Sequence, residues 1–150
     1  MDPLALAGTL TAGIMALAFP GHMLSAQGRT YAARLSPVPI TVAMQETVGG
    51  LGSATAALSG NTLTVEGAFE GLRSPATVAR LHLAPRGVRG PAIADLTVSR
   101  AASGTLKGAV ELTAREREAL DRSALYVQIH SEKAPDGNLW GWLLPQEAKR

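Results

Sequence analysis

Residues 62–69 read Thr-Leu-Thr-Val-Glu-Gly-Ala-Phe, and apolar and polar side chains alternate along them. Leu63, Val65 and Phe69 fall on one side of an extended chain, which is the period of a strand with one buried face. Several runs of this kind recur along the chain, and together they predict an all-β fold, an antiparallel sandwich or barrel of about seven to eight strands. The similar runs are Tyr31–Leu35, Ile40–Met44, Thr77–Leu83, Ala92–Val98, Thr105–Leu112, Ala124–His130 and Asn138–Leu144.

One helix is expected to interrupt these strands. Thr113-Ala114-Arg115-Glu116 has the form of a capping box, in which the Thr113 hydroxyl and the Glu116 carboxylate each accept the other residue's amide hydrogen. We expect one short helix to run from here to about Arg122, with its charged face in solvent.

The segments between the strands are rich in Gly and Pro. Ser36–Pro39 and Val48–Ser53 are interpreted as loops because they contain residues that interrupt regular structure. Gly49–Gly52 and Gly87–Gly90 lack the lysine and the following helix of a phosphate-binding loop, so both are interpreted as turns.

Composition narrows the classes of function. The 150 residues give room for one domain and an appendage, and 46% apolar with 17% charged residues indicates a folded chain. A net charge of +2 with scattered Lys and Arg argues against a nucleic-acid-binding protein. The absence of cysteine excludes disulfides, thiolate metal sites and a cysteine nucleophile. No Gly-x-Ser-x-Gly motif or recognisable acidic pair is present, so we expect neither catalysis nor a cofactor.

The N-terminal segment is apolar and uncharged from Leu4 to Ala26. It lacks the basic start of a signal peptide, although Leu24–Ala26 has the small residues of a cleavage site. As a helix, Leu4 to Leu24 would extend about 31 Å, enough to cross the hydrocarbon core. Residues 1–26 are therefore interpreted as a single transmembrane anchor helix or a signal segment, and residues 27–150 as the β-domain.

A row of small residues marks this segment. Gly8, Ala12 and Ala16 recur every four residues, a pattern that lets transmembrane helices approach closely. The alternative is that Ala and Gly are simply abundant in the whole chain. Arg29 and Arg34 follow the segment, and the positive-inside rule alone would place the β-domain in the cytoplasm.

The C-terminal part resembles a known family. Tyr126-Val127-Gln128-Ile129-His130-Ser131, followed by Pro135-Asp136-Gly137-Asn138-Leu139-Trp140-Gly141-Trp142-Leu143, is similar to the closing signature of CHRD (chordin-type) domains. Ala79–Leu83 and Gly90–Leu96 resemble the family's Ala-His-Ile-His segment and the Gly-Pro run after it. The resemblance covers about residues 30–144 and implies an all-β domain of an exported or membrane-anchored bacterial protein, without established catalytic activity.

Two histidines are candidate metal ligands. Where the family often shows His-x-His, this chain has Arg80 and His82, and a guanidinium repels a cation instead of binding it. His82 and His130 are expected on neighbouring strands, where they and a water would hold Cu or Zn if a third ligand converged. The sequence names no such ligand. The alternative is that both imidazoles make ordinary hydrogen bonds on a half-exposed sheet face.

Two tryptophans are candidate partner-binding residues. By alternation Leu139, Gly141 and Leu143 face the core, whereas Trp140 and Trp142 face the other way. Exposed together, the two rings would form a docking surface for a protein or a membrane interface. The alternative is that another segment covers this face and makes both rings part of a core.

Together these features predict a non-enzymatic accessory subunit on the periplasmic side of the inner membrane. A single-pass anchor would pack through Gly8, Ala12 and Ala16 in the bilayer, and the β-domain would dock through Trp140 and Trp142 on a respiratory, transport or light-harvesting complex. The alternative is a free periplasmic protein that binds a metal or small ligand through His82 and His130. Its N-terminal segment would then be a cleaved signal peptide.

Overall fold

The computed structural model describes residues 28–147. These residues form nine strands, one α-helix and one 3-10 helix. In chain order the elements are β1 (Arg29–Pro37), η1 (Val42–Met44), β2 (Leu51–Ser59), β3 (Thr62–Glu70), β4 (Ala76–Leu83), β5 (Ala92–Val98), β6 (Gly104–Glu111), α1 (Ala114–Asp121), β7 (Leu125–Ser131), β8 (Ala134–Trp142) and β9 (Leu144–Pro145).

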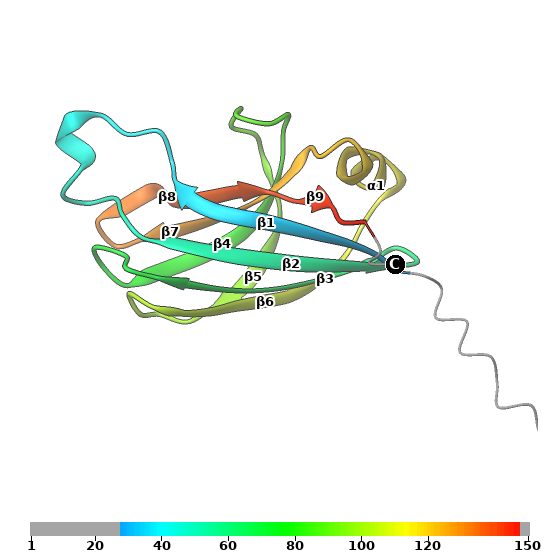
Figure 1. The fold of residues 1–150 in the computed structure, drawn as a ribbon, viewed down its shortest axis with the longest axis horizontal. Coiled ribbons are helices and arrows are strands. Elements are labelled where there is room, and N and C mark those ends of the chain that lie inside the picture. The colour runs from blue at the N-terminus through cyan, green and yellow to red at the C-terminus, as the bar shows by residue number, and fades with distance from the viewer. Residues whose placement is uncertain (1–27, 148–150) are drawn as a thin grey trace, which may run out of the picture.

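The strands close into an antiparallel barrel (Figure 1). Their order is β2-β3-β6-β5-β4-β7-β8-β1-β9, and β1 also pairs with β2, which closes the sheet on itself. Short β9 lies beside the start of β1. The expected all-β barrel with one short helix is thereby confirmed for the described residues. The expected N-terminal helix, with Gly8, Ala12 and Ala16, lies outside them.

Two junctions in the barrel are short. β5 pairs with β6 only at Thr97 and Val98, and β1 pairs with β8 only at Ser36 and Pro37. The other neighbours pair over longer stretches, such as Thr62–Phe69 of β3 along β6. The barrel therefore has two well-paired halves, β9-β1-β2-β3-β6 and β5-β4-β7-β8, joined by two short seams.

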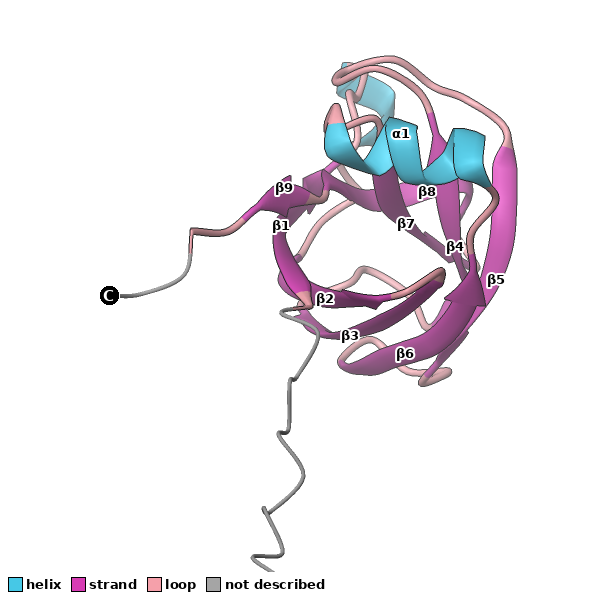
Figure 2. Cartoon of the chain, turned by 90° about the vertical axis from the view of Figure 1, so that its right-hand side faces the viewer, coloured by secondary structure: helices cyan, strands magenta, loops and turns pink. Residues whose placement is uncertain are grey.

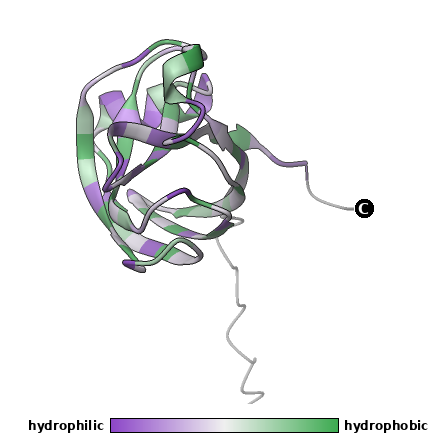
Figure 3. Ribbon diagram, turned by 90° about the vertical axis from the view of Figure 1, so that its left-hand side faces the viewer, coloured by the Kyte–Doolittle hydropathy of each residue, from purple (hydrophilic) through white to green (hydrophobic). Residues whose placement is uncertain are grey.

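The barrel interior holds the main hydrophobic core. Leu63, Val65 and Phe69 are buried there, as the alternation along residues 62–69 predicts. They pack with inward-facing residues of the other strands, including Leu81 and Leu139. Figure 3 shows hydrophobic and hydrophilic residues alternating along the strands. Burial of this apolar surface is the main term that stabilises the fold.

Helix α1 covers one end of the barrel (Figure 2). The Thr113 hydroxyl accepts from the Glu116 amide at 3.2 Å, and the Glu116 carboxylate accepts from the Thr113 amide at 3.0 Å. The predicted capping box is confirmed. At the other end of the helix Asp121 pairs with Arg29 at 2.7 Å, which ties the helix to the start of β1.

Two predictions between β1 and β2 were wrong. Ile40–Met44 is not a strand but a loop that contains η1, and Val42 is 82% exposed. Pro37 is the last residue of β1, and Pro39 follows two residues later. Neither proline has an amide hydrogen to donate to a neighbouring strand, so the strand does not continue into this segment. Strand β2 was not predicted at all: residues 48–53 were interpreted as a loop and residues 54–59 were assigned no element, whereas the strand spans Leu51–Ser59.

No helix in residues 28–147 is both long enough and apolar enough to span a bilayer.

Candidate functional site

The outer side of β4, β7 and β8 carries a layer of polar and aromatic side chains. His82 on β4 is level with Tyr126 on β7, which is level with Trp142 on β8. Gln128 is likewise level with Trp140. Their neighbours along the strands lie in the main core, so these side chains point away from it. The outer layer is formed by His82, Tyr126, Gln128, His130, Trp140 and Trp142.

The two histidines are held in the same way. His82 Nδ1 donates to the carbonyl oxygen of Gly90 at 2.9 Å, and His130 Nδ1 donates to that of Pro135 at 2.8 Å. A carbonyl only accepts, so each Nδ1 carries the proton and each Nε2 keeps a free lone pair when the ring is neutral. Both side chains are only 8% exposed, and both Nε2 atoms are buried without a hydrogen-bond partner.

These unpartnered nitrogens lie on rings that are close together. The ring centroids of His82 and His130 are 6.4 Å apart, with 30° between the planes. The expectation that they sit on neighbouring strands is confirmed, since β4 and β7 are paired. Buried polar atoms normally have partners, so two orphaned acceptors on neighbouring rings mark a place for a ligand.

Tyr126 holds His82 in place through its ring and, by way of Gly90, through its hydroxyl. Its ring stacks on the imidazole with centroids 4.8 Å apart and planes 15° apart. Its hydroxyl accepts from the Gly90 amide at 3.0 Å, and the same glycine's carbonyl binds His82. Tyr126 thus positions both the ring and the backbone group that sets its tautomer.

The loop between β4 and β5 reaches over the outer layer to the start of β8. Arg89, in the loop between β4 and β5, donates to the carbonyl oxygen of Asp136 at 2.8 Å. The Arg89 guanidinium also lies over Trp140, 5.9 Å from the ring centroid. Gln128 Nε2 donates to the same Asp136 carbonyl at 3.0 Å. These contacts tie the β4–β5 loop to the start of β8 beside the two histidines.

The site favours neutral imidazole at His82. Burial lowers the pKa of His82, and the nearby charges of His130, Arg80 and Arg89 lower it further, against the hydrogen bond to Gly90. Arg80 is itself paired with Asp95 at 2.9 Å, which offsets part of its charge. At neutral pH Nε2 of His82 therefore carries a lone pair and no proton, while Nδ1 keeps its proton.

The comparison with family models identifies this architecture. The model described as the CHRD domain matches residues 31–143, from β1 to the end of β8. The chain belongs to the CHRD family. It matches no curated protein and no solved structure at a significant level.

The tryptophans of this CHRD domain are placed as alternation predicts, but they are not freely exposed. Trp140 is only 9% exposed and Trp142 is half-buried. Val38 and Val48, from the segment between β1 and β2, pack in one cluster with Trp140 and Tyr126. Trp142 Nε1 donates to the carbonyl oxygen of Ala84 at 3.0 Å. The prediction of a large exposed pair was therefore wrong, because two loops fold over this face.

The tryptophan edges that remain accessible line a shallow pocket of about 220 Å³ with Arg34 and Arg86. Neither arginine forms an ion pair with another described residue. Any docking on Trp140 and Trp142 would therefore occur beside two guanidinium groups.

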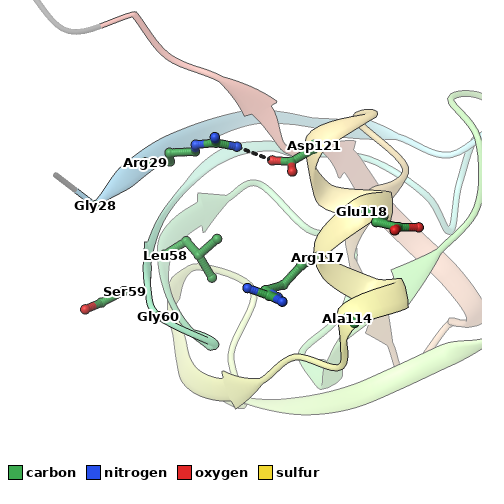
Figure 4. Close-up of a pocket in the computed structure, with 9 residues that line it drawn as sticks. All are labelled: Gly28, Arg29, Leu58, Ser59, Gly60, Ala114, Arg117, Glu118 and Asp121. Atoms are coloured by element: carbon green, nitrogen blue, oxygen red, sulfur yellow. Dashed lines mark hydrogen bonds and ion pairs between the residues drawn. The ribbon is translucent and has the colours of Figure 1, made fainter. Parts of the chain in front are cut away.

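A larger pocket of about 440 Å³ lies between α1, the start of β1 and the end of β2 (Figure 4). Arg29 and Asp121 line it but are paired with each other. No cluster of three or more His, Asp or Glu that could hold a metal occurs among residues 28–147, in this pocket or elsewhere. We therefore assign the candidate site to the histidines, where unpartnered nitrogens give a reason for ligand binding.

Several residues of the site carried no sequence signal of their own. Gly90, Pro135 and Asp136 act through backbone carbonyls, and Arg89 lies in a loop that reads as a turn. The placement of Tyr126 next to His82 follows from the register of β4 and β7, which the sequence alone does not give. Of the site residues, the pair His82 and His130 is the part that could be predicted from residue type and spacing in the sequence.

Proposed function

We propose that this CHRD domain is a non-enzymatic binding domain that takes up a transition-metal ion through His82 and His130. One observation carries the proposal: both Nε2 atoms are buried without a partner, while both Nδ1 atoms donate to backbone carbonyls. Metal-binding histidines commonly donate their other ring hydrogen in this way, which fixes the ring and raises its basicity. Neutral imidazole is a ligand for Cu, Zn, Ni and Fe.

A metal titration of the full-length chain tests this. We expect the metal-free protein to bind one ion of Cu, Zn or Ni per chain at neutral pH. His82→Gln and His130→Gln should each weaken binding at least about 100-fold, because each removes a direct ligand. Isothermal titration calorimetry and metal analysis after gel filtration provide the two readouts.

The third histidine provides the matched control. His22 lies outside the described residues, and His22→Gln should bind the metal like the wild type. Thermal unfolding of each variant shows whether it is folded. If folded His82→Gln and His130→Gln bind as tightly as the wild type, the metal is bound elsewhere and the proposal fails.

We also propose that residues 1–26 hold the domain on the periplasmic side of the inner membrane as an accessory subunit of a membrane complex. The uncharged stretch from Leu4 to Ala26 supports the anchor. The pocket that Arg34 and Arg86 form with Trp140 and Trp142 supports docking on an acidic partner surface.

Fractionation of cells that produce the native chain tests the anchor. We expect the chain in the membrane fraction, with a mass that includes residues 1–26, and in a large complex after mild detergent extraction. An Arg34→Glu/Arg86→Glu variant should remain in the membrane but migrate separately from the complex. A soluble mature chain that begins near Gln27 would contradict the anchor.

A further inference from the structure

We infer that the ion bound between His82 and His130 is monovalent copper, Cu(I), held by two imidazoles in a low-coordinate site. This inference rests on the metal-binding function proposed above and specifies its ligand. The number of ligands, the spacing of the rings and the charge of the surroundings each support it.

The first argument is the number of ligands. Among the described residues, no Asp or Glu groups with the two imidazoles as a third ligand, and the chain contains no cysteine. Structural Zn sites use four ligands and tetragonal Cu(II) sites also need several, so two imidazoles leave either ion unsaturated. Cu(I) accepts two nitrogen ligands in a linear arrangement.

The second argument is the distance between the rings. Two metal–nitrogen bonds of about 2.0 Å, with about 1.2 Å from each nitrogen to its ring centre, reach centroids up to about 6.4 Å apart. The centroids of His82 and His130 are 6.4 Å apart. With each Nε2 directed at the ion, this separation corresponds to an almost straight N–metal–N angle, and a strongly bent geometry would require the rings to move closer together.

The third argument is charge. The Arg89 guanidinium lies over Trp140 of the same layer, and both histidines are only 8% exposed. The penalty for moving an ion from water into a buried site grows with the square of its charge, so a monovalent ion carries about a quarter of the penalty of a divalent one. Repulsion from the Arg89 guanidinium is likewise halved. Both effects favour Cu(I) over Zn(II) and Cu(II).

Competition titrations under anaerobic conditions test the choice of ion. Metal-free full-length protein is titrated with Cu(I) against a chromogenic Cu(I) chelator, and separately with Cu(II) and Zn(II). We expect one Cu(I) per chain and a Kd at least about 100-fold lower than for Zn(II) or Cu(II). X-ray absorption of the loaded protein should show two nitrogen ligands. The chain has only two tryptophans, Trp140 and Trp142, both in the outer layer, so their fluorescence gives an independent readout.

The control variant addresses the other soft ligand close to this layer. Met44 packs against the cluster that contains Trp140, and its thioether could in principle bind Cu(I). Met44→Leu should retain the Cu(I) affinity of the wild type, whereas His82→Gln and His130→Gln should lose it.

The outcomes separate this inference from the proposed function. The inference of low-coordinate Cu(I) is overturned if Zn(II) or Cu(II) binds through His82 and His130 as tightly as Cu(I), or if X-ray absorption shows four ligands. In either case the proposed metal site itself stands. If no metal binds, or if folded histidine variants bind Cu(I) like the wild type, both are overturned.

Discussion

Replacing Gly90 by alanine is expected to weaken metal binding by about 10–100-fold, although residue 90 contributes no side chain to the site. A Cβ at this position would collide with the Leu83 carbonyl oxygen and stand 2.7 Å from the Ala84 Cβ. The backbone would have to shift, and the carbonyl that accepts from His82 Nδ1 would shift with it. We also expect a loss of about 1–3 kcal/mol in the free energy of unfolding. Calorimetric titration and denaturant unfolding measure the two effects.

Gly87 in the same loop provides the control for Gly90→Ala. A Cβ at Gly87 would meet nothing within 4 Å, but its φ of +80° disfavours alanine. Gly87→Ala should therefore lose about 1–2 kcal/mol of stability and bind metal normally. If Gly90→Ala binds metal like Gly87→Ala, the Gly90 carbonyl does not position His82 as we describe.

Replacing Gly141 by alanine is expected to lower the free energy of unfolding by about 3 kcal/mol. This glycine lies on β8 at the seam with β1, where a Cβ would collide with the Arg34 carbonyl oxygen and stand 2.9 Å from its carbonyl carbon. The colliding atoms are backbone, so they cannot rotate away as a side chain can. Separation of β1 from β8 would relieve the clash and open the barrel. Denaturant unfolding monitored by circular dichroism measures the change.

Gly108→Ala is the matched control for the seam. Gly108 also lies within a strand, but the atom closest to its added Cβ is the end of the Leu96 side chain, at 2.7 Å. A side-chain end can adjust, so stability should stay within about 1 kcal/mol of the wild type. A Gly141→Ala variant as stable as Gly108→Ala would show that β1 and β8 have room to separate without loss.

The parts of the fold that followed from the sequence are those determined by local pattern. Residues 62–69 alternate with a period of two because one face is buried, and the capping box at Thr113 needs only residues three apart. The strand β2 was missed because its buried side chains are small, among them Ala54 and Ala56, and alternation of small residues is weak in the sequence. The apolar run Ile40–Met44 looked like a strand but has no neighbouring strand to pair with.

For the site, residue type was more informative than position. His82 and His130 were identified as a possible pair, but nothing in the sequence indicates that their Nδ1 atoms reach the carbonyls of Gly90 and Pro135. The first contact depends on the loop between β4 and β5, and the second on how the start of β8 lies against β7. The segment between β1 and β2 explains the error for Trp140, whose outward direction was predicted correctly and whose covering by Val38 and Val48 was not.

The short seams have a consequence for how the molecule moves. Both histidines and Tyr126, which stacks on His82, lie on β4 and β7, in the half of the barrel that also contains β5 and β8. Thermal opening begins where few hydrogen bonds must break, which here means β5 from β6 and β1 from β8. When the two halves move apart, β4 and β7, which carry His82 and His130, should stay paired along their long ladder. The distance between the two imidazoles should therefore change little when the barrel opens at its seams.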